Sequence, residues 1–485
     1  MNGTLKRAAV ACLLMFGLLM ANVTYLGAVK GDSLRHDNRN VRSFYERYAV
    51  DRGWITADNG KVTLAKTVDT GDPTYRFERR YPQGKAFTHV VGYFAPESAT
   101  GIEGAESKYL DGSHPDLVVR RAIDLITNKP AKGASVDLAL NVAAQQIAYK
   151  DLANTGRRGA VVALDPRSGA ILTMVSVPSY DPNPLAVANK DNVNKAYAKL
   201  DKDPNKPLLD RAIDLTYAPG STFKTITSAA FLSDNSSRSA ETMVDAPDSK
   251  TFKDSNTPLV NYHGESCGGR ATLLDALTIS CNTAFGIIGV GLGYDKLKEQ
   301  AAKFGIGTKL AIPLSVAGSS IGPDEGETAL AQTSIGQRSN QMTPMQMAMV
   351  AAGIANKGTV MKPYLVNKVM GPDGSEVTAA EPEEFSEATS PEVAAELTKM
   401  MVNVVRSGTG TAAQLPGITV AGKTGTAETA PGQAAHAWFI SFAPADNPRV
   451  AVAVFVESGS AGTDASGGTV AAPIARDVMQ AVLKK

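Results

Sequence analysis

The first strong pattern in the chain is an apolar run near the amino terminus. Residues 8–29 are almost entirely apolar and follow Lys6 and Arg7. A helix of this length, at about 1.5 Å per residue, crosses a hydrocarbon core of about 30 Å. The cations on its amino side predict a cytoplasmic tail at residues 1–7 and export of everything after the run. We therefore predict an uncleaved, single-pass anchor in the cell membrane.

A cleaved signal peptide is the alternative for this run. Leu26-Gly27-Ala28 offers a possible cleavage site. The apolar region of a signal peptide is shorter, however, at about 7–15 residues, which favours the anchor. The rest of the chain is exported under either interpretation. We find no second apolar run of this length in the sequence, so we do not expect a channel or a transporter.

Beyond the anchor the hydrophobic pattern predicts two domains. Residues 30–134 are polar and contain short alternating stretches that indicate strands, which predicts a β-rich, membrane-proximal pedestal domain. Residues 135–485 begin with strand and helix patterns, are mainly helical between 221 and 355, and return to strands and a last helix. Strands at both ends of this segment predict an α+β domain whose sheet is closed by the two ends.

The individual elements of the second domain can be located by their patterns. The segments are a helix at 143–152, a hairpin of 161–164 and 170–175 around the turn residues 165–169, strands at 438–442 and 450–456, and a helix opening at Pro473.

Composition and charge exclude several classes of protein. The 49 basic and 48 acidic residues nearly balance, so we do not expect nucleic acid as a main partner. The three cysteines cannot supply a four-thiolate zinc site, and the five histidines are scattered. We therefore predict no metal site, and nothing in the sequence implies a cofactor.

The first motif with chemical potential is Ser221-Thr222-Phe223-Lys224. Pro219-Gly220 breaks the chain just before it, and a helical stretch follows. Ser221 is therefore expected in the first turn of a helix, where free backbone N–H groups favour negative charge. A spacing of three puts Lys224 on the same face. Lysine can activate a serine if burial or a second cation lowers its pKa. Taken alone, the pattern is common by chance and is more typical of a helix cap followed by a surface lysine.

The second motif is Ser280-Cys281-Asn282, after an apolar helical pattern at 273–277. We expect it to end a buried helix. The Ser280 hydroxyl could relay a proton, and the Asn282 amide could bind a substrate carbonyl or hold the lysine. A polar helix end explains this motif as well when it is taken alone.

The third motif is Lys423-Thr424-Gly425-Thr426, after a strand-like stretch at 418–422. Alternation puts Lys423 and Gly425 on one side and Thr424 and Thr426 on the other. Lys423 would supply the second cation, Gly425 would let a substrate backbone approach, and the threonines could bind a carboxylate. The simpler interpretation of the isolated motif is an edge-strand lysine that favours solubility.

In this order the three motifs resemble the S-x-x-K, S-x-N and K-T-G set of penicillin-binding proteins and serine β-lactamases. The chain is similar to class B penicillin-binding proteins, which are monofunctional D,D-transpeptidases, and to their actinobacterial penicillin-binding protein A group. The resemblance covers nearly all of the exported chain. Its other segments are residues 79–82, 89–93, 101–104, 144–146, 165–169, 178–183, 209–212, 219–221, 342–344 with Gln346, and 437–439.

The resemblance implies a transpeptidase domain with an antiparallel sheet flanked by helices, and a role for each motif residue. It implies Ser221 as nucleophile, Lys224 as general base, Ser280 as proton relay, Asn282 as substrate contact, Lys423 as electrostatic partner, Thr424, Gly425 and Thr426 as substrate-binding residues, and the backbone N–H groups of Ser221 and Thr426 as oxyanion hole.

The implied reaction is the cross-linking of peptidoglycan during cell-wall synthesis, associated with division. The nucleophile would attack the D-Ala-D-Ala carbonyl of a stem peptide and release the terminal D-Ala. An amine from a neighbouring stem would then resolve the acyl-enzyme, and β-lactams would inhibit by acylating the same serine. The partners implied are stem peptides, β-lactams, the cytoplasmic membrane and division or elongation proteins on the pedestal.

Two cysteines bear on the predicted site. Cys267 and Cys281 are both expected outside the membrane, where a disulfide is permitted, and Cys281 is the middle residue of the second motif. A bridge would stiffen the loop before the helix that carries this motif. Two buried free thiols are the alternative, and the residues alone leave the choice open.

Several other functions compete with a transpeptidase. Residues 264–268 match the nucleophile elbow G-x-S-x-G, but their flanks do not repeat strand–helix–strand. A serine β-lactamase needs neither an anchor nor about 130 residues before its catalytic domain. A D,D-carboxypeptidase differs only in using water as the acyl acceptor, so the sequence separates it poorly from a transpeptidase. A class A transpeptidase needs room for a glycosyltransferase domain, which the stretch between anchor and hairpin does not offer. A β-lactam sensor needs a large signalling part, and a cell-wall scaffold does not need intact motifs.

Overall fold

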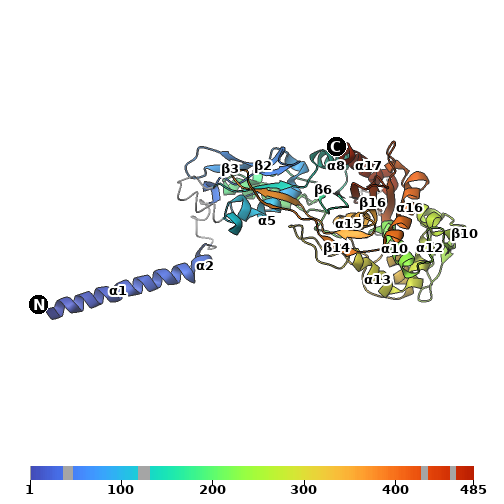
Figure 1. Ribbon diagram of the computed structural model, residues 1–485, viewed down its shortest axis with the longest axis horizontal. Coiled ribbons are helices and arrows are strands. Elements are labelled where there is room, and N and C mark those ends of the chain that lie inside the picture. Colours follow the sequence, from blue (N-terminus) through green and yellow to red (C-terminus); the bar gives the residue numbers. More distant parts are fainter. Residues whose placement is uncertain (1, 36–46, 118–131, 428–434, 459–465, 485) are drawn as a thin grey trace.

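The computed structural model describes residues 2–35, 47–117, 132–427, 435–458 and 466–484. Figure 1 shows an elongated molecule, with helix α1 (Asn2–Ala28) at one end, a sheet-rich part next to it and a larger mixed part at the other end. Within the described residues, Gly3–Ala28 is the one helix long and apolar enough to cross a membrane. It contains most of the predicted span, residues 8–29.

The pedestal is built around a six-stranded sheet with the order β13-β12-β4-β1-β2-β3. Its strands are β1 (Ile55–Ala57), β2 (Val62–Asp69), β3 (Phe77–Arg80), β4 (Ser135–Leu138), β12 (Val366–Met370) and β13 (Glu376–Ala379). Strands β1 and β4 are parallel, and the other neighbours are antiparallel. Three of the six strands therefore come from beyond residue 134, after the stretch predicted as the pedestal. Residues 36–46 and 118–131 of that stretch lie outside the described part.

A buried ion cluster holds the pedestal together. The Glu103 carboxylate accepts hydrogen bonds from Arg79 Nε at 2.7 Å and from Arg52 Nη2 at 3.1 Å. Burial alone would raise the pKa of Glu103, but the two guanidinium groups outweigh burial and hold the pKa below its usual value. The neutral Tyr81 hydroxyl also donates a hydrogen bond to this carboxylate, at 3.2 Å. The cluster keeps β3 against the short helix α5 (Gly101–Ala105).

The larger domain contains a five-stranded antiparallel sheet with the order β15-β16-β17-β5-β6. Its strands are β5 (Gly159–Leu164), β6 (Ile171–Val177), β15 (Ala421–Ala427), β16 (His436–Ala443) and β17 (Val450–Val456). They come from both ends of the domain, as the pattern predicted. The predicted α+β class, with an antiparallel sheet flanked by helices, is confirmed.

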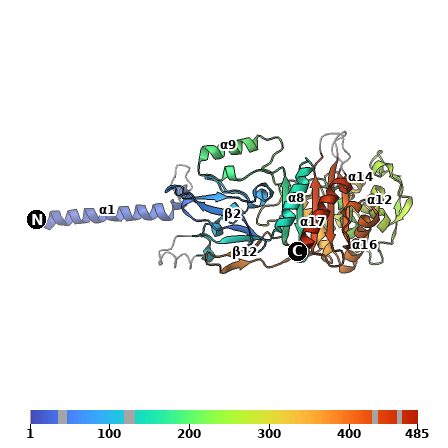
Figure 2. The same ribbon diagram turned by 90° about the horizontal axis from the view of Figure 1, so that it is seen from above.

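Both faces of this sheet are covered, which explains its unbroken apolar strands. In β17, Val452 and Val454 belong to one core with α8 (Val142–Asn154) and α17 (Ala472–Leu483), whereas Ala453 and Phe455 belong to the other. Helix α15 (Pro344–Ala355) lies on this second face. In Figure 2, α8 and α17 are drawn next to each other at the centre of the molecule.

The remaining helices form a lobe beyond the second face of the sheet. They are α10 (Lys224–Asp234), α11 (Leu273–Thr278), α12 (Asn282–Leu292), α13 (Tyr294–Lys303), α14 (Glu327–Ser334) and α16 (Pro391–Ser407). Helix α10 contacts α12, α13 and α16, and Lys224 is buried at its first position. Two small two-stranded sheets lie in the same lobe, namely β7 (Met243–Ala246) with β10 (Gly269–Thr272), and β8 (Ser249–Lys250) with β9 (Leu259–Val260).

Further elements of the described chain lie outside these groups, and all of them except the 12-residue α9 are short. They are α2 (Gly31–Arg35), α4 (Thr88–Val91), α6 (Ser107–Leu110), α9 (Lys190–Asp201), β11 (Thr359–Met361) and β14 (Glu384–Glu387).

Candidate active site

Ser221 lies in a tight turn at the start of α10. The turn is the 3-10 segment Gly220–Phe223, and Gly220 has a φ of 54°, which favours glycine. A Cβ on Gly220 would lie 2.6 Å from the Thr426 carbonyl oxygen, and a Cβ on Gly336 would lie 2.0 Å from the Gly220 carbonyl oxygen. The glycines therefore let the turn approach β15 and the end of α14 closely. The predicted helix after Ser221 is confirmed.

Two buried lysines meet at one hydroxyl group. Lys224 Nζ lies 2.6 Å from the Ser280 carbonyl oxygen, 2.7 Å from Asn282 Oδ1 and 3.2 Å from Ser280 Oγ. Lys423 Nζ donates to Ser280 Oγ at 3.0 Å and to the Thr424 carbonyl oxygen at 2.9 Å. Neither lysine is exposed to solvent. Ser280 thus joins the first and third motifs across the core.

Burial and mutual repulsion decide the charge states of the two lysines. Burial lowers the pKa of Lys224 well below its usual value, and the charge of Lys423 lowers it further. Burial lowers the pKa of Lys423 to about 7. Two adjacent buried ammonium groups are unfavourable, so this environment favours a neutral Lys224. A neutral Lys224 still has two N–H groups for the Ser280 carbonyl and Asn282 Oδ1, and its lone pair remains.

Ser280 occupies a bend between two helices. Helix α11 ends at Thr278 and α12 begins at Asn282, so the second motif both ends one helix and starts the next. Ser280 has a φ of 64°, a left-handed conformation that a serine rarely adopts. Such a strained position costs on the order of 1–3 kcal/mol and persists only where the surroundings impose it. Here the bend directs Ser280 Oγ to both lysines.

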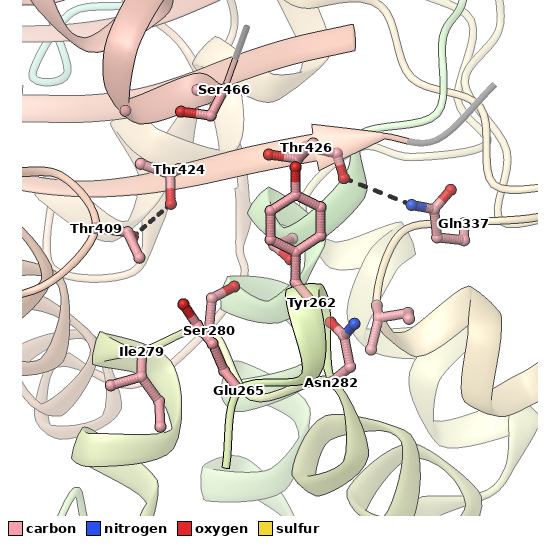
Figure 3. Close-up of a pocket in the computed structure, with 14 residues that line it drawn as sticks. Tyr262, Glu265, Ile279, Ser280, Asn282, Gln337, Thr409, Thr424, Thr426 and Ser466 are labelled. Atoms are coloured by element: carbon pink, nitrogen blue, oxygen red, sulfur yellow. Dashed lines mark hydrogen bonds between the residues drawn. The ribbon is translucent and has the colours of Figure 1, made fainter. Parts of the chain in front are cut away.

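A pocket of about 280 Å³ opens in front of these groups. Figure 3 shows its lining, with Thr424 and Thr426 on one side and Ser280 and Asn282 on the other. Ser221 lines the same pocket, while Lys224 and Lys423 are buried outside its lining. Of the predicted residues, the structure therefore gathers Ser221, Ser280, Asn282, Thr424 and Thr426 around one cavity.

Gly425 has a different neighbour from the one expected. A Cβ at this position would lie 2.8 Å from the Pro219 carbonyl oxygen and 2.9 Å from Thr222 Cγ2. The close approach that this glycine allows is therefore between β15 and the Ser221 turn of the same chain. Contact of Gly425 with a substrate backbone stays a prediction.

Asn282 also has partners within the chain. Its Oδ1 accepts from Lys224, and its Nδ2 donates to the Val260 carbonyl oxygen at 3.1 Å. The sequence allowed this amide either to bind a substrate carbonyl or to hold the lysine, and the structure shows it holding Lys224. Binding of a substrate by Asn282 stays a prediction.

Comparison with known proteins decides the family. Residues 159–480 match the penicillin binding protein transpeptidase domain, and residues 52–136 match the penicillin binding protein A dimerisation domain. The chain belongs to the penicillin-binding protein transpeptidase family. The match to the transpeptidase domain covers well over half of the chain and includes all three motifs.

The relatives that match this penicillin-binding protein over its full length are named as peptidoglycan D,D-transpeptidases. The chain is 44% identical to peptidoglycan D,D-transpeptidase PbpA of Mycolicibacterium smegmatis over 495 residues, covering 100% of both chains. It is 41% identical to the enzyme of the same name from Mycobacterium tuberculosis, covering 100% of this chain and 99% of the relative. The solved ceftriaxone acyl-enzyme complex of penicillin-binding protein A from M. tuberculosis superposes with a TM-score of 0.87 at 40% identity, covering 90% of this chain and 100% of that one. The predicted family and transpeptidase class are confirmed.

The nucleophile-elbow alternative is wrong. Ser266 lies in a loop and donates a hydrogen bond to Asp248 Oδ1 at 2.7 Å. An elbow serine sits on a sharp turn between a strand and a helix, whereas the 3-10 segment Tyr262–Gly264 precedes Ser266 here.

Sequence reasoning missed several residues that line the pocket of this penicillin-binding protein. They are Tyr262, Glu265, Ile279, Ile335, Gln337, Thr409, Ser466, Gly467 and Gly468. Gln337 Nε2 lies 3.5 Å from the Thr426 carbonyl oxygen, and Thr409 Oγ1 lies 2.5 Å from Thr424 Oγ1. Most of these residues lie in loops, and their spacing carries no signal that sequence patterns could have detected.

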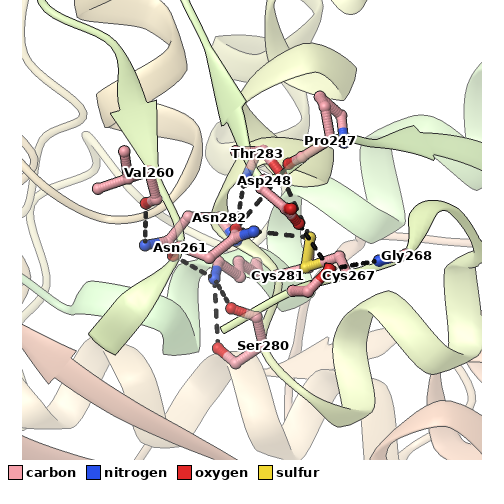
Figure 4. Close-up of a disulfide and its surroundings, with 12 residues drawn as sticks. Pro247, Asp248, Val260, Asn261, Cys267, Gly268, Ser280, Cys281, Asn282 and Thr283 are labelled. Atoms are coloured by element: carbon pink, nitrogen blue, oxygen red, sulfur yellow. Dashed lines mark hydrogen bonds between the residues drawn. A yellow bond between two sulfur atoms is a disulfide. The ribbon is translucent and has the colours of Figure 1, made fainter. Parts of the chain in front are cut away.

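The open question about the cysteines is answered by the structure. Cys267 and Cys281 form a disulfide with a Cα–Cα distance of 6.2 Å, as Figure 4 shows. A second link lies beside it, because Asn261 Oδ1 accepts from the backbone N–H groups of Asn282 and Thr283 at 2.9 and 3.1 Å. The segment 260–267 is therefore attached to the second motif at both of its ends.

Removing this disulfide is expected to destabilise the lobe. For a loop that spans 14 positions, chain entropy predicts a loss of about 3 kcal/mol in the free energy of unfolding. The Cys267→Ser/Cys281→Ser double variant should therefore unfold at a lower denaturant concentration than the unreduced wild type. Thiol titration of the denatured wild type should give one thiol, from Cys12, before reduction and three afterwards. Three thiols before reduction would contradict the bridge.

Proposed function

We propose that Ser221 is the nucleophile of this D,D-transpeptidase and Lys224 its general base, with Ser280 as proton relay and Lys423 as electrostatic partner. The observation that supports this proposal best is the meeting of two buried lysines at Ser280 Oγ, beside a pocket that Ser221 lines. Burial of two like charges without a carboxylate favours a neutral base next to the nucleophile. The substrate is the D-Ala-D-Ala end of a peptidoglycan stem peptide.

The first half of the reaction forms an acyl-enzyme. Lys224 takes the proton from Ser221 Oγ while this oxygen bonds to the carbonyl carbon of the penultimate D-Ala. The peptide C–N bond then breaks. The departing nitrogen receives the proton from Lys224 through the Ser280 hydroxyl, and D-Ala leaves as an amine.

The second half transfers the acyl group to the stem of a neighbouring chain. A neutral amine attacks the ester carbonyl carbon, a C–N bond forms, and the bond from this carbon to Ser221 Oγ breaks. One proton of the amine returns to Ser221 Oγ through Lys224. The product is a peptide cross-link and a regenerated serine.

The remaining predicted residues bind the substrate in this proposal. Thr424 and Thr426 hold the terminal carboxylate from the β15 side, where the neighbouring Lys423 favours an anion. The backbone N–H groups of Ser221 and Thr426 form the oxyanion hole, and losing one such donor typically costs about 10²–10³ in rate. Asn282 keeps Lys224 in place and contacts the substrate.

The position of the enzyme in the cell follows from its first helix. We infer that residues 8–29 anchor the chain in the membrane, with residues 1–7 in the cytoplasm and the catalytic domain outside. The apolar helix Gly3–Ala28 supports the anchor, and Lys6 and Arg7 support its orientation. Along the sequence we divide the exported part into a pedestal at 30–134 and a transpeptidase domain at 135–485, with β4, β12 and β13 of the second stretch completing the sheet of the pedestal. Binding of division or elongation proteins by the pedestal is part of the same proposal.

A single experiment tests the roles and the competing activities together. Full-length protein in detergent is incubated with penicillin, its intact mass is followed over time, and the adduct is mapped by digestion. We expect a long-lived adduct on the peptide that contains Ser221. An adduct that forms and disappears quickly with hydrolysed drug would instead indicate a serine β-lactamase. No adduct at high drug concentration would contradict Ser221 as nucleophile and favour a scaffold.

The acceptor separates a transpeptidase from a carboxypeptidase. We expect a cross-linked product when a D-Ala-D-Ala peptide and an amine acceptor are supplied together. Release of D-Ala with hydrolysed donor as the sole product would show that water is the acceptor.

A further inference from the structure

One wall of the active-site pocket is apolar and carries a single charge. Val260, Tyr262 and Ile279 are exposed by 52%, 40% and 37%, so their apolar surface is open to a ligand. Tyr262 and Ile279 line the pocket, and Val260 precedes Tyr262 by two residues. Glu265 is the one residue with a charged side chain in the described lining of this pocket. An apolar surface thus ends in a carboxylate.

This wall is held firmly to the catalytic groups. Asn282 Nδ2 donates to the Val260 carbonyl oxygen, and Asn261 Oδ1 accepts from the backbone of Asn282. The Cys267–Cys281 disulfide closes the other end of the segment, next to Ser280. In the view of Figure 3, Glu265 is drawn on the side of Ser280 and Asn282, away from Thr424 and Thr426.

The charge of the wall fits one of the two substrates. The donor peptide ends in a carboxylate, which Glu265 would repel and which the proposed function assigns to the β15 side. The second substrate is an amine, and an aliphatic amine with a pKa of about 10.4 is positively charged at neutral pH. An amine at the end of an aliphatic chain therefore matches both properties of the wall: the apolar surface fits its methylene groups, and the carboxylate fits its ammonium group.

We propose that Val260, Tyr262, Glu265 and Ile279 form the acceptor subsite, and that Glu265 selects an amine carried on an aliphatic side chain. The inference rests on the proposed function, because it requires an acyl-enzyme on Ser221. Glu265 is a positioning residue here. The ammonium group gives one proton to solvent before the neutral amine attacks the ester, and the second proton returns to Ser221 Oγ as described above.

The test separates use of the acceptor from acylation. Full-length wild type and Glu265→Gln receive a D-Ala-D-Ala donor peptide and an α-acetylated lysine peptide as acceptor, and product is measured by mass spectrometry against acceptor concentration. We expect Glu265→Gln to raise the KM for the amine about five-fold, as loss of a partly exposed ion pair would, with kcat nearly unchanged. Glu265→Lys should raise this KM further, and Glu265→Asp should restore most of the affinity.

Salt provides a readout that a merely structural role would not change. Added NaCl should raise the amine KM of the wild type and leave that of Glu265→Gln almost unaffected, because salt screens the ion pair. The matched control is Glu376→Gln, which removes an exposed carboxylate from β13 of the pedestal and should behave like the wild type.

The outcomes distinguish this proposal from the one on which it rests. Acylation of Ser221 by penicillin should stay within two-fold of wild type in Glu265→Gln, because this step needs no amine. An unchanged amine KM with unchanged salt dependence would overturn the subsite. Slower penicillin acylation with normal amine use would also overturn it, and would assign the wall to the donor. Absence of any adduct on wild-type Ser221 would instead count against the proposed function.

Discussion

Ser221→Ala is expected to abolish both the penicillin adduct and cross-linking. Without the hydroxyl group, no ester can form, and the other groups of the pocket have no covalent intermediate on which to act. Ser221 lies at the pocket surface, so removing one oxygen atom should leave the free energy of unfolding nearly unchanged. Intact-mass measurement of the full-length variant after incubation with penicillin, followed by an assay for cross-linked product, checks both losses.

A matched control exists in the same lobe. Ser266 belongs to the other serine motif and is exposed, with its hydroxyl on Asp248 rather than in the pocket lining. Ser266→Ala should therefore acylate like the wild type. A persistent adduct in Ser221→Ala, or a loss of the adduct in Ser266→Ala, would show that the nucleophile has been assigned to the wrong serine.

The local elements of the catalytic domain could be predicted because their patterns are local. The hairpin predicted at 161–164 and 170–175 corresponds to β5 and β6, and the predicted last strand matches β17 at both ends. The composition of the pedestal sheet could not be predicted in the same way. Strand β4 pairs in parallel with β1, and β12 adds to β4 from more than two hundred residues later. Such pairing depends on long-range contacts, and a short strand carries no local record of its partner.

The catalytic site, too, could be predicted from the sequence only where its residues are related by local structure. Ser221 and Lys224 could be paired from sequence because a helix fixes their relative position, and the three motifs together supplied the family. Ser280 has a left-handed backbone because it lies between the end of α11 and the start of α12. Both lysines meet at its hydroxyl group only in this tertiary arrangement. Tyr262 and Glu265 reach the pocket through a loop attached by Asn261 and a disulfide. Loops position such side chains through tertiary contacts, which sequence spacing does not encode.

Lys224→Met should slow acylation by penicillin by about 10²–10⁴-fold, the usual contribution of a general base. Methionine has a similar length and fills the buried site, but it leaves the Ser280 carbonyl and Asn282 Oδ1 without their donor, which costs about 1–3 kcal/mol each at most. Circular dichroism of the full-length variant verifies that it is folded. The rate is obtained from intact mass against time. Lys303→Met, at the end of α13 on the surface, is the matched control and should acylate normally.

The pH dependence connects this loss of rate to the base itself. Lys224 accepts a proton only when it is neutral, so the acylation rate of the wild type should rise as pH rises through the pKa of Lys224. Because burial and Lys423 hold that pKa well below its usual value, the rise should be complete at a lower pH than an ordinary lysine would allow. Lys423→Met removes the neighbouring cation, so the pKa of Lys224 increases and the rising limb should move to higher pH. The Lys224→Met variant should lose this limb, and a limb that stays in place in both variants would mean that another group is the base.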